Sequence, residues 1–177
     1  MSEQSNPWKT LSSRIAYQNH WLTLYEDDVI TPSGHPGKYT YTESPPFVLM
    51  VGYHQERFIL VRQYRYPAQQ PVTEFPGGGI EEGEAPLAAA QREFEEETGF
   101  RATKWTELGT INNPNLATVF LAEDLVETGT NNMKEEGITG MIQLTWAEID
   151  QLIPNGELND SKTLAALLLF NRHHMTA

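Results

Sequence analysis

The sequence predicts an α+β fold in which a central helix is preceded and followed by β-strands. The helix is predicted at 86–99, because Pro86 has the fixed φ of a first helical turn and Gly99 is a typical C-terminal cap. Apolar residues between them recur at the spacing of one helix face. Strands are predicted from short apolar or alternating runs on both sides of it, at 47–53, 57–63, 105–111, 117–122 and 140–144.

The two ends of the chain have regular patterns of their own. Segment 21–29 mixes β-forming residues with charges, a turn follows at 31–34, and 37–42 resumes a strand pattern, which predicts an antiparallel hairpin. Helices are predicted at 146–153 and 161–173. We therefore expect an N-terminal strand region at 1–45 and a main domain at 46–177. The glycine-rich stretch Pro76–Gly79, just before the central helix, is predicted to be an irregular loop.

Composition narrows the possible functions. The 177 residues are 39% hydrophobic and 20% charged, an ordinary balance for a globular protein. The formal charge of -12 argues against non-specific nucleic-acid binding, which needs a basic face. The absence of cysteine excludes disulfides and thiolate sites, so a metal would need oxygen or imidazole ligands. No signal-peptide pattern or apolar run of about 20 residues is present, and we expect a cytoplasmic protein without a membrane partner.

The chemistry is expected at the central helix. Glu93, Glu96 and Glu97 project within about a third of the helix circumference, where unpaired carboxylates repel one another. A hard divalent cation such as Mg²⁺ removes this repulsion and keeps positions open for water and phosphate. The glycines before the helix let backbone atoms approach a metal or a phosphate closely. A solvated acidic helix face is the alternative interpretation.

The complete spacing of this segment decides between these interpretations. It runs Gly78, five residues, Glu84, seven residues, Arg92-Glu93-Phe94, one residue, Glu96-Glu97, one residue, and Gly99-Phe100. This pattern resembles the full signature of the Nudix hydrolases, and every specified position matches.

The resemblance implies an α/β/α sandwich with a mixed sheet and hydrolysis of a nucleoside diphosphate linked to another moiety. It implies that Glu93, Glu96, Glu97 and the carbonyl of Gly77 hold divalent metal, with Mg²⁺ expected and Mn²⁺ open. Two catalytic residues are implied in this segment. Glu97 would act in catalysis through the metal that it binds, and Arg92 would orient a metal-binding glutamate. Glu84 would be structural or electrostatic, and Gly78 would let the substrate's phosphates approach.

Motifs outside the signature resemble those of the ADP-ribose pyrophosphatase and nucleoside diphosphate sugar hydrolase branch. These motifs are Val61–Pro67, Glu74–Gly78 and Asn155–Ser161, together with the N-terminal strand region. The branch implies a homodimer built through the N-terminal strands. Arg62 and Arg65 are candidates for binding substrate phosphate, and ordinary strand arginines are the alternative.

The catalytic base is expected on the loop Lys134–Gly137. The resemblance favours Glu136 over Glu135, and an ordinary acidic loop explains these residues equally well. The base would accept a proton from the attacking water.

The expected substrate is ADP-ribose, which would be split into AMP and ribose 5-phosphate. One departure weakens this choice, because the segment Ile111–Thr118 keeps a proline but lacks the acidic residue common in ADP-ribose pyrophosphatases. GDP-mannose, another nucleotide sugar or a dinucleotide therefore stay open as substrates. A non-catalytic ADP-ribose sensor is the alternative of another class, and the three retained glutamates argue against it.

Overall fold

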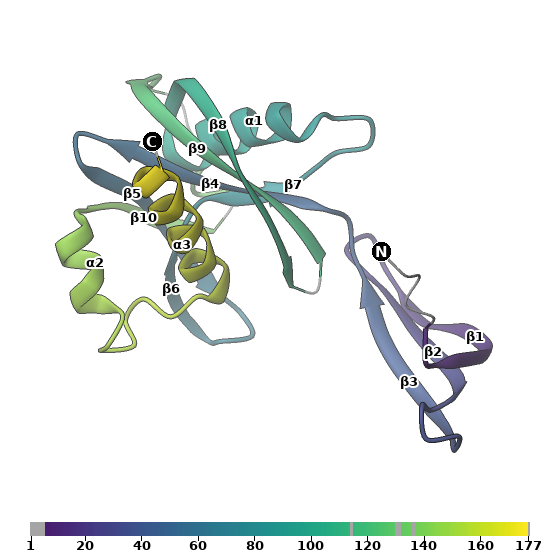
Figure 1. Ribbon diagram of the computed structural model, residues 1–177. Helices are drawn as coiled ribbons and strands as arrows, with labels where there is room; N and C mark the ends of the chain where they lie inside the picture. The colour runs from purple at the N-terminus through teal and green to yellow at the C-terminus, as the bar shows by residue number, and fades with distance from the viewer. Residues whose placement is uncertain (1–5, 114, 130–131, 136, 177) are drawn as a thin grey trace. The chain divides into compact units, whose positions relative to one another are not determined.

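The computed structural model describes residues 6–113, 115–129, 132–135 and 137–176. The chain divides into two compact units, residues 1–45 and 46–177, which Figure 1 shows as a small sheet and a larger mixed body. Within the described ranges, no helix has both the length and the apolar character needed to cross a membrane. The two units are described separately below.

The N-terminal unit is a three-stranded antiparallel sheet in the order β1-β2-β3. Its strands are β1 (Lys9–Gln18), β2 (Thr23–Ile30) and β3 (Pro36–Glu43). The predicted hairpin is confirmed as β2 and β3, which pair from Thr23↔Glu43 to Ile30↔Pro36. The first strand was not among the predicted elements, because all ten of its residues are exposed and leave no alternating pattern.

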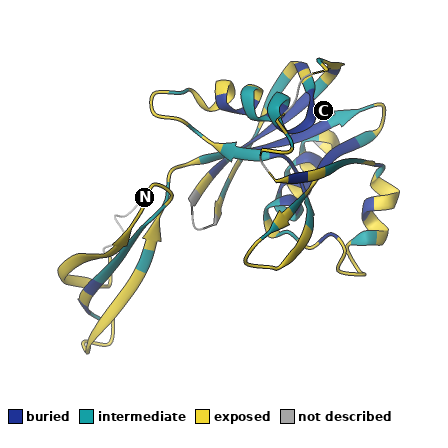
Figure 2. Ribbon diagram, turned by 180° about the vertical axis from the view of Figure 1, so that it is seen from behind, coloured by how far each residue is buried: buried dark blue, intermediate teal, exposed yellow. Residues whose placement is uncertain are grey.

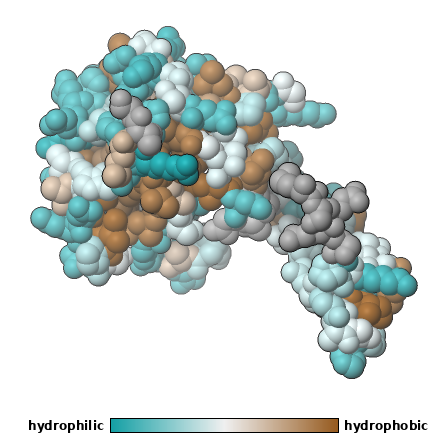
Figure 3. Space-filling model, in the orientation of Figure 1, coloured by the Kyte–Doolittle hydropathy of each residue, from teal (hydrophilic) through white to brown (hydrophobic). Residues whose placement is uncertain are grey.

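This small sheet has one aromatic face. Tyr25 stacks on Tyr41 with ring centroids 5.2 Å apart, and Trp8 contacts Tyr39 edge-to-face at 5.3 Å. Asp27 lies opposite Tyr39 in the ladder and therefore shares this face. No helix belongs to this unit among its described residues. Hydrophobic surface is visible on the unit in Figure 3, and most of its ribbon is exposed in Figure 2.

The opposite face of the same sheet is charged. Glu26 accepts hydrogen bonds from Arg14 at 2.8 Å and from Lys38 at 2.9 Å, and Asp28 accepts one from Ser12 at 2.8 Å. The Lys38 and Arg14 hydrogen bonds lower the pKa of Glu26. The alternation between charged and aromatic residues makes this a two-sided sheet with only one face suited to water.

The second unit is built on a seven-stranded mixed sheet with strand order β10-β5-β4-β9-β8, to which β6 adds at β5 and β7 at β4. Only β4 and β9 run parallel to each other among its paired described strands. The strands are β4 (Phe47–His54), β5 (Arg57–Arg65), β6 (Gln70–Glu74), β7 (Gly77–Gly79), β8 (Phe100–Asn113), β9 (Asn115–Glu127) and β10 (Ile138–Leu144), and the helices are α1 (Pro86–Thr98), α2 (Trp146–Leu152) and α3 (Ser161–Thr176).

Helices cover both faces of this sheet. One core cluster joins Phe94 of α1 to Met50 and Ile59 of the central strands. The other core cluster joins Phe170 of α3 and Ile149 of α2 to strand residues such as Leu60. Since successive strand residues point to opposite faces, the two clusters lie on opposite sides of the sheet. The predicted α/β/α sandwich with a mixed sheet is thus confirmed, and Figure 2 shows its central strands buried.

The predicted elements of this unit are confirmed, with three corrections. The strands predicted at 105–111 and 117–122 extend into the long hairpin of β8 and β9, and β6 was not predicted. The prediction of irregular backbone at Pro76–Gly79 was wrong for its glycines, because Gly77–Gly79 form β7 and pair with Phe47–Leu49. A Cβ on Gly77 would overlap the Val48 carbonyl, so glycine permits the close pairing here.

Candidate active site

The carboxylate cluster is carried by the second half of α1. The helix begins with Pro86 in its first turn and ends at Gly99, which adopts the left-handed conformation at φ 71°. The N–H of Gly99 closes the helix on the carbonyl of Glu95 at 2.8 Å. Its apolar side buries Ala90 and Phe94 against the sheet, which leaves the acidic side facing the glycine strand β7.

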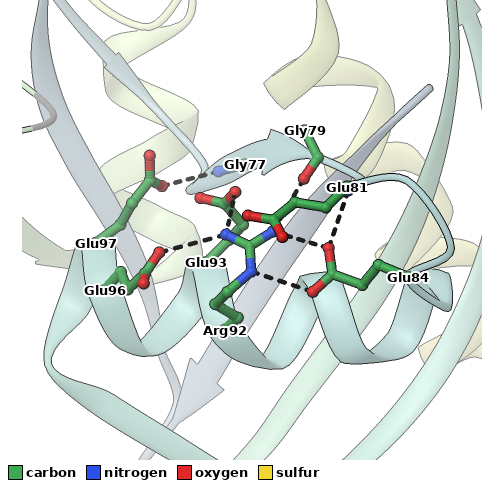
Figure 4. A network of polar contacts seen from close by, with 8 residues as sticks. All are labelled: Gly77, Gly79, Glu81, Glu84, Arg92, Glu93, Glu96 and Glu97. Atoms are coloured by element: carbon green, nitrogen blue, oxygen red, sulfur yellow. Dashed lines mark hydrogen bonds and ion pairs between the residues drawn. The ribbon is translucent and has the colours of Figure 1, made fainter. Parts of the chain in front are cut away.

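Arg92 is the hub of the polar network in Figure 4. Its guanidinium binds both oxygens of Glu84, at 3.1 and 2.9 Å, and donates to Glu93 at 2.7 Å. It also donates to Glu96 at 3.4 Å and to the carbonyl of Gly79 at 3.1 Å. One cation therefore compensates three carboxylates and ties the helix to the glycine strand.

The charges in this network shift one another's pKa. The hydrogen bond with Glu84 is the main cause that raises the pKa of Arg92 above its ordinary value. The same hydrogen bond, with help from the backbone N–H of Glu81, lowers the pKa of Glu84. The Glu84 carboxylate is accordingly ionised at neutral pH and fixes Arg92 in place. This assigns a concrete contact to the structural role expected for Glu84.

Glu97 is the buried member of the cluster, at 4% exposure. Its carboxylate accepts a hydrogen bond from the N–H of Gly77 at 2.9 Å, so the two residues are neighbours although they are 20 positions apart in sequence. A buried carboxylate is costly unless it is hydrogen-bonded or binds a cation. The structure thus places Gly77 beside Glu97, and the contact between them is made by the N–H of Gly77.

The segment that presents Gly77 is anchored on both sides of the sheet. The carbonyl of Pro76 accepts from the N–H of Met50 at 2.9 Å, and the N–H of Phe75 donates to the hydroxyl of Thr163 at 3.0 Å. Thr163 is fully buried, and its hydroxyl in turn donates to Asp160 at 2.8 Å. Helix α3 therefore holds the backbone before Gly77 from the far face of the sheet. Sequence reasoning did not assign this role to Thr163, because a single threonine in a helix has no distinguishing pattern.

Gly78 leaves the space that Glu93 occupies. A Cβ added to Gly78 would overlap the carboxylate of Glu93, whereas a Cβ on Gly79 would meet nothing within 4 Å. A side chain at position 78 would therefore displace the Glu93 carboxylate, and the signature glycine leaves that carboxylate in place.

These residues fit a divalent metal by their chemistry and placement. Glu93, Glu96 and Glu97 offer only carboxylate oxygens, which hard cations prefer, and they lie on one helix beside Gly77. As the side chains stand, no group of three His, Asp or Glu residues in the described part of the chain is arranged to hold a metal ion. Arg92 engages Glu93 and Glu96 instead, so metal binding would exchange these hydrogen bonds for coordination.

The two candidate phosphate-binding arginines lie on opposite faces of the sheet. By strand alternation Arg62 shares a face with Leu60, which packs toward α2 and α3. Arg65 shares a face with Ile59, which packs toward α1. Only Arg65 therefore lies on the face that carries the glutamates. The structure separates a pair that the sequence placed three residues apart.

Arg65 is fixed by a residue that sequence reasoning left without a role. Its Nε donates to Glu74 at 2.8 Å, and Glu74 is only 3% exposed. Glu74 lies directly before the Phe75-Pro76-Gly77 segment, so the same stretch positions both Arg65 and the backbone that contacts Glu97. No sequence pattern indicated this role, because β6, which ends at Glu74, has the sequence QPVTE and lacks a strand pattern.

The loop expected to carry the base passes the end of α1. The N–H of Asn132 donates to the carbonyl of Glu96 at 2.8 Å, which ties the loop to the glutamate helix. Glu135 is exposed, and its own N–H donates to the carbonyl of Asn132 at 2.9 Å. Glu136, the residue favoured as base, lies outside the described residues.

Comparison with known proteins decides the family. The model of the NUDIX domain matches residues 45–167, and that of the nucleoside diphosphate sugar hydrolase N-terminal domain matches residues 8–42. The chain belongs to the Nudix family. The boundaries of the two matches agree with the division into a strand unit and a sandwich. The carboxylate network described above lies inside the Nudix match. The chain is accordingly a Nudix hydrolase.

Individual relatives cover nearly the whole chain. An ADP-ribose pyrophosphatase of Bacillus subtilis is 31% identical over 90% of both chains. A methanol dehydrogenase activator of Bacillus methanolicus is 30% identical, also over 90% of both. The crystal structure of an ADP compounds hydrolase superimposes with a TM-score of 0.83 at 22% identity, over 97% of this chain and 96% of that one. The last comparison supports the fold.

The contact between Gly78 and Glu93 predicts a matched pair of variants. Gly78→Ala should weaken the apparent affinity for a divalent metal ion by roughly 10- to 100-fold, the usual cost of disturbing the support of a ligand, because Glu93 is displaced. Gly79→Ala should retain the parent affinity, since its Cβ meets open space. Magnesium titration of hydrolysis measures both, with thermal melting as the check on folding. Equal metal dependence in the two folded variants would contradict this account of the signature glycine.

Proposed function

We propose that this protein hydrolyses ADP-ribose to AMP and ribose 5-phosphate with Mg²⁺, Mn²⁺ being the second candidate ion. The observation that carries the proposal is the intact carboxylate cluster on α1, with Glu97 hydrogen-bonded to Gly77. The relative named ADP-ribose pyrophosphatase supports the choice of substrate. Another relative of similar identity has a different name, so other nucleotide sugars and dinucleotides belong in the test.

The carboxylates would hold the cation, and the chain's own residues would position the substrate. A divalent cation bound at Glu93, Glu96, Glu97 and the Gly77 carbonyl supplies positive charge that neutralises the diphosphate and acidifies the attacking water. Water then forms a bond to one phosphorus while the bridging P–O bond breaks, which gives the two monophosphates. Arg92 holds Glu93 and Glu96 oriented between turnovers through its hydrogen bonds.

Arg65 is the arginine we assign to the diphosphate. The buried Glu74 holds its Nε, which leaves the two terminal nitrogens as the atoms that can donate to a phosphate in the fork geometry. The Arg65 side chain is 41% exposed, so a ligand can reach it. Arg62 lies on the other face of the sheet and is not assigned to this reaction.

The substrate proposal is tested by a panel. ADP-ribose, GDP-mannose, UDP-glucose, NADH, diadenosine polyphosphates and dGTP are incubated with Mg²⁺ or with chelator, and monophosphate release is measured. Metal-dependent cleavage should be fastest for ADP-ribose, and Glu97→Gln should lose nearly all of it, because it removes a charge and a metal ligand while glutamine can still accept from Gly77. Tight ADP-ribose binding without cleavage of any compound would instead identify a sensor.

The base is proposed on the loop Lys134–Gly137, with Glu136 as the first choice and Glu135 as the second. The loop's tether to the Glu96 carbonyl supports a base at this end of α1. Single Glu136→Gln and Glu135→Gln variants form a matched pair. The variant that lacks the base should lose roughly 10²- to 10⁴-fold in kcat with little change in KM, and the other should stay near the parent. Full activity in both variants would show that the base does not lie on this loop.

We also propose that the protein is a homodimer joined through its N-terminal units. The aromatic face of β1–β3 includes side chains with half of their surface exposed, such as Tyr39 at 50% and Ile15 at 52%. An uncovered apolar sheet face is not stable by itself in water. On the same face Asp27 is 8% exposed, and its Oδ1 is buried without a hydrogen-bond partner among the described residues. A second copy can supply both the apolar cover and the missing donor.

Sedimentation equilibrium tests the dimer. The parent should have twice the 20.0 kDa mass of one chain. Tyr39→Lys should shift the equilibrium toward monomer, because it replaces an aromatic contact by a charge that Asp27 can pair within one subunit. Thr40→Lys is the matched control, since the neighbouring residue points to the charged face and lies opposite Glu26. A monomeric parent, or dimers of equal stability in both variants, would overturn the proposal.

A further inference from the structure

A cavity opens on the face of the sheet that the glutamates do not use. It has a volume of about 370 Å³ and lies between strands β5, β6 and β10, helix α2 and the segment that leads to α3. Figure 1 shows this segment running past β6. The residues that matter for the argument are Arg62, Thr73, Ile142, Leu152 and Asn159. None of them takes part in the carboxylate network around Arg92.

Arg62 is the charged group of this cavity. Within the described part of the chain, every other arginine has an ion pair or another polar contact, whereas none is recorded for the Arg62 side chain. The protein carries a formal charge of -12, so carboxylates are abundant and an arginine without one is unusual. The Arg62 carbonyl accepts from the Thr139 hydroxyl at 3.1 Å, which fixes the backbone that carries the guanidinium. The guanidinium is thus available to an anion from outside the chain.

The rest of the lining indicates what the anion is attached to. Thr73 and Asn159 offer a hydroxyl and an amide group that pair with sugar hydroxyls, and Ile142 and Leu152 offer apolar surface to carbon atoms. No aromatic side chain is found among the described residues that line the cavity, so nothing there stacks on a nucleobase. The volume is at the lower end of the range for small-molecule sites, about 300–1,000 Å³.

Glu157 limits the charge of the ligand. Among the described residues that line the cavity, Glu157 carries the one carboxylate. This carboxylate would repel a second phosphate and would accept hydrogen bonds from hydroxyl groups. One arginine and one glutamate therefore match a molecule with a single phosphate at one end and hydroxyl groups at the other.

We propose that the Arg62 cavity is a binding site for a phosphorylated sugar or polyol, separate from the catalytic site on the α1 face. Arg62 binds the phosphate through its fork of N–H donors, and Asn159 and Thr73 bind the hydroxyl groups. The inference does not depend on which nucleotide sugar is hydrolysed, because none of its residues touches the carboxylate cluster.

Calorimetric titration of the full chain in chelator tests this site without the metal-dependent reaction. The probes are ribose 5-phosphate, glucose 6-phosphate and glycerol 3-phosphate, with ribose and inorganic phosphate as partial ligands. At least one phosphorylated probe should bind saturably and more tightly than either partial ligand. Arg62→Gln should weaken it by at least about tenfold, the lower range for a lost charge-assisted contact. Hydrogen exchange should slow at 70–73 and 152–159 and stay unchanged in α1.

Two control variants locate the ligand. Arg57→Gln removes the same charge from the same strand outside the cavity, and Arg65→Gln removes the arginine of the catalytic face. Both should bind the probe within about twofold of the parent, since exposed charges contribute little at a distance. Absence of saturable binding below about 10 mM, the limit of useful affinity, overturns the proposal. Unchanged binding in Arg62→Gln, or loss in Arg65→Gln, overturns it as well and assigns any ligand to another place.

Discussion

The structure of the catalytic face depends on the compensation of clustered carboxylates by one guanidinium. Glu84, Glu93 and Glu96 all lie within hydrogen-bonding distance of Arg92, which is long enough to reach from the helix to the carbonyl of Gly79. Without that cation, like charges at helical spacing would repel one another and splay the side chains. With it, the carboxylates are held together in a state that a divalent cation can take over. The cluster is thus organised by groups of the chain itself.

The second requirement is a fixed backbone opposite the helix. Gly77 reaches Glu97 only because the segment before it is hydrogen-bonded to Met50 in the sheet and to Thr163 in α3. The anchor in α3 is itself held by Asp160. A buried hydroxyl that bridges a backbone N–H and a carboxylate has a defined geometry, since each buried polar group needs its partner. Helix α3 thereby stabilises the catalytic face from the opposite side of the sheet.

Strand alternation divides the molecule into two chemical faces. Along β5 the odd positions Ile59 and Arg65 belong to the α1 side, and the even positions Leu60 and Arg62 belong to the side of α2 and α3. The same rule gives the N-terminal sheet an aromatic face and a charged face. Strand β5 therefore contributes one arginine, Arg65, to the catalytic face and a second arginine, Arg62, to a separate cavity. The N-terminal sheet can expose charge to water and apolar surface to a partner.

The sequence by itself determined the helix α1, its two ends and the family, because these depend on local rules. Pro86 and Gly99 impose backbone conformations, and the signature places its glutamates on one turn of helix. It also predicted the central strands, whose buried runs are continuous in the chain. The strand β7, the anchor at Thr163, the role of Glu74 and the separation of Arg62 from Arg65 were decided only by the tertiary structure. Each of these depends on which distant backbone or side chain is brought near, and hydrogen-bond partners of that kind leave no local pattern in the sequence.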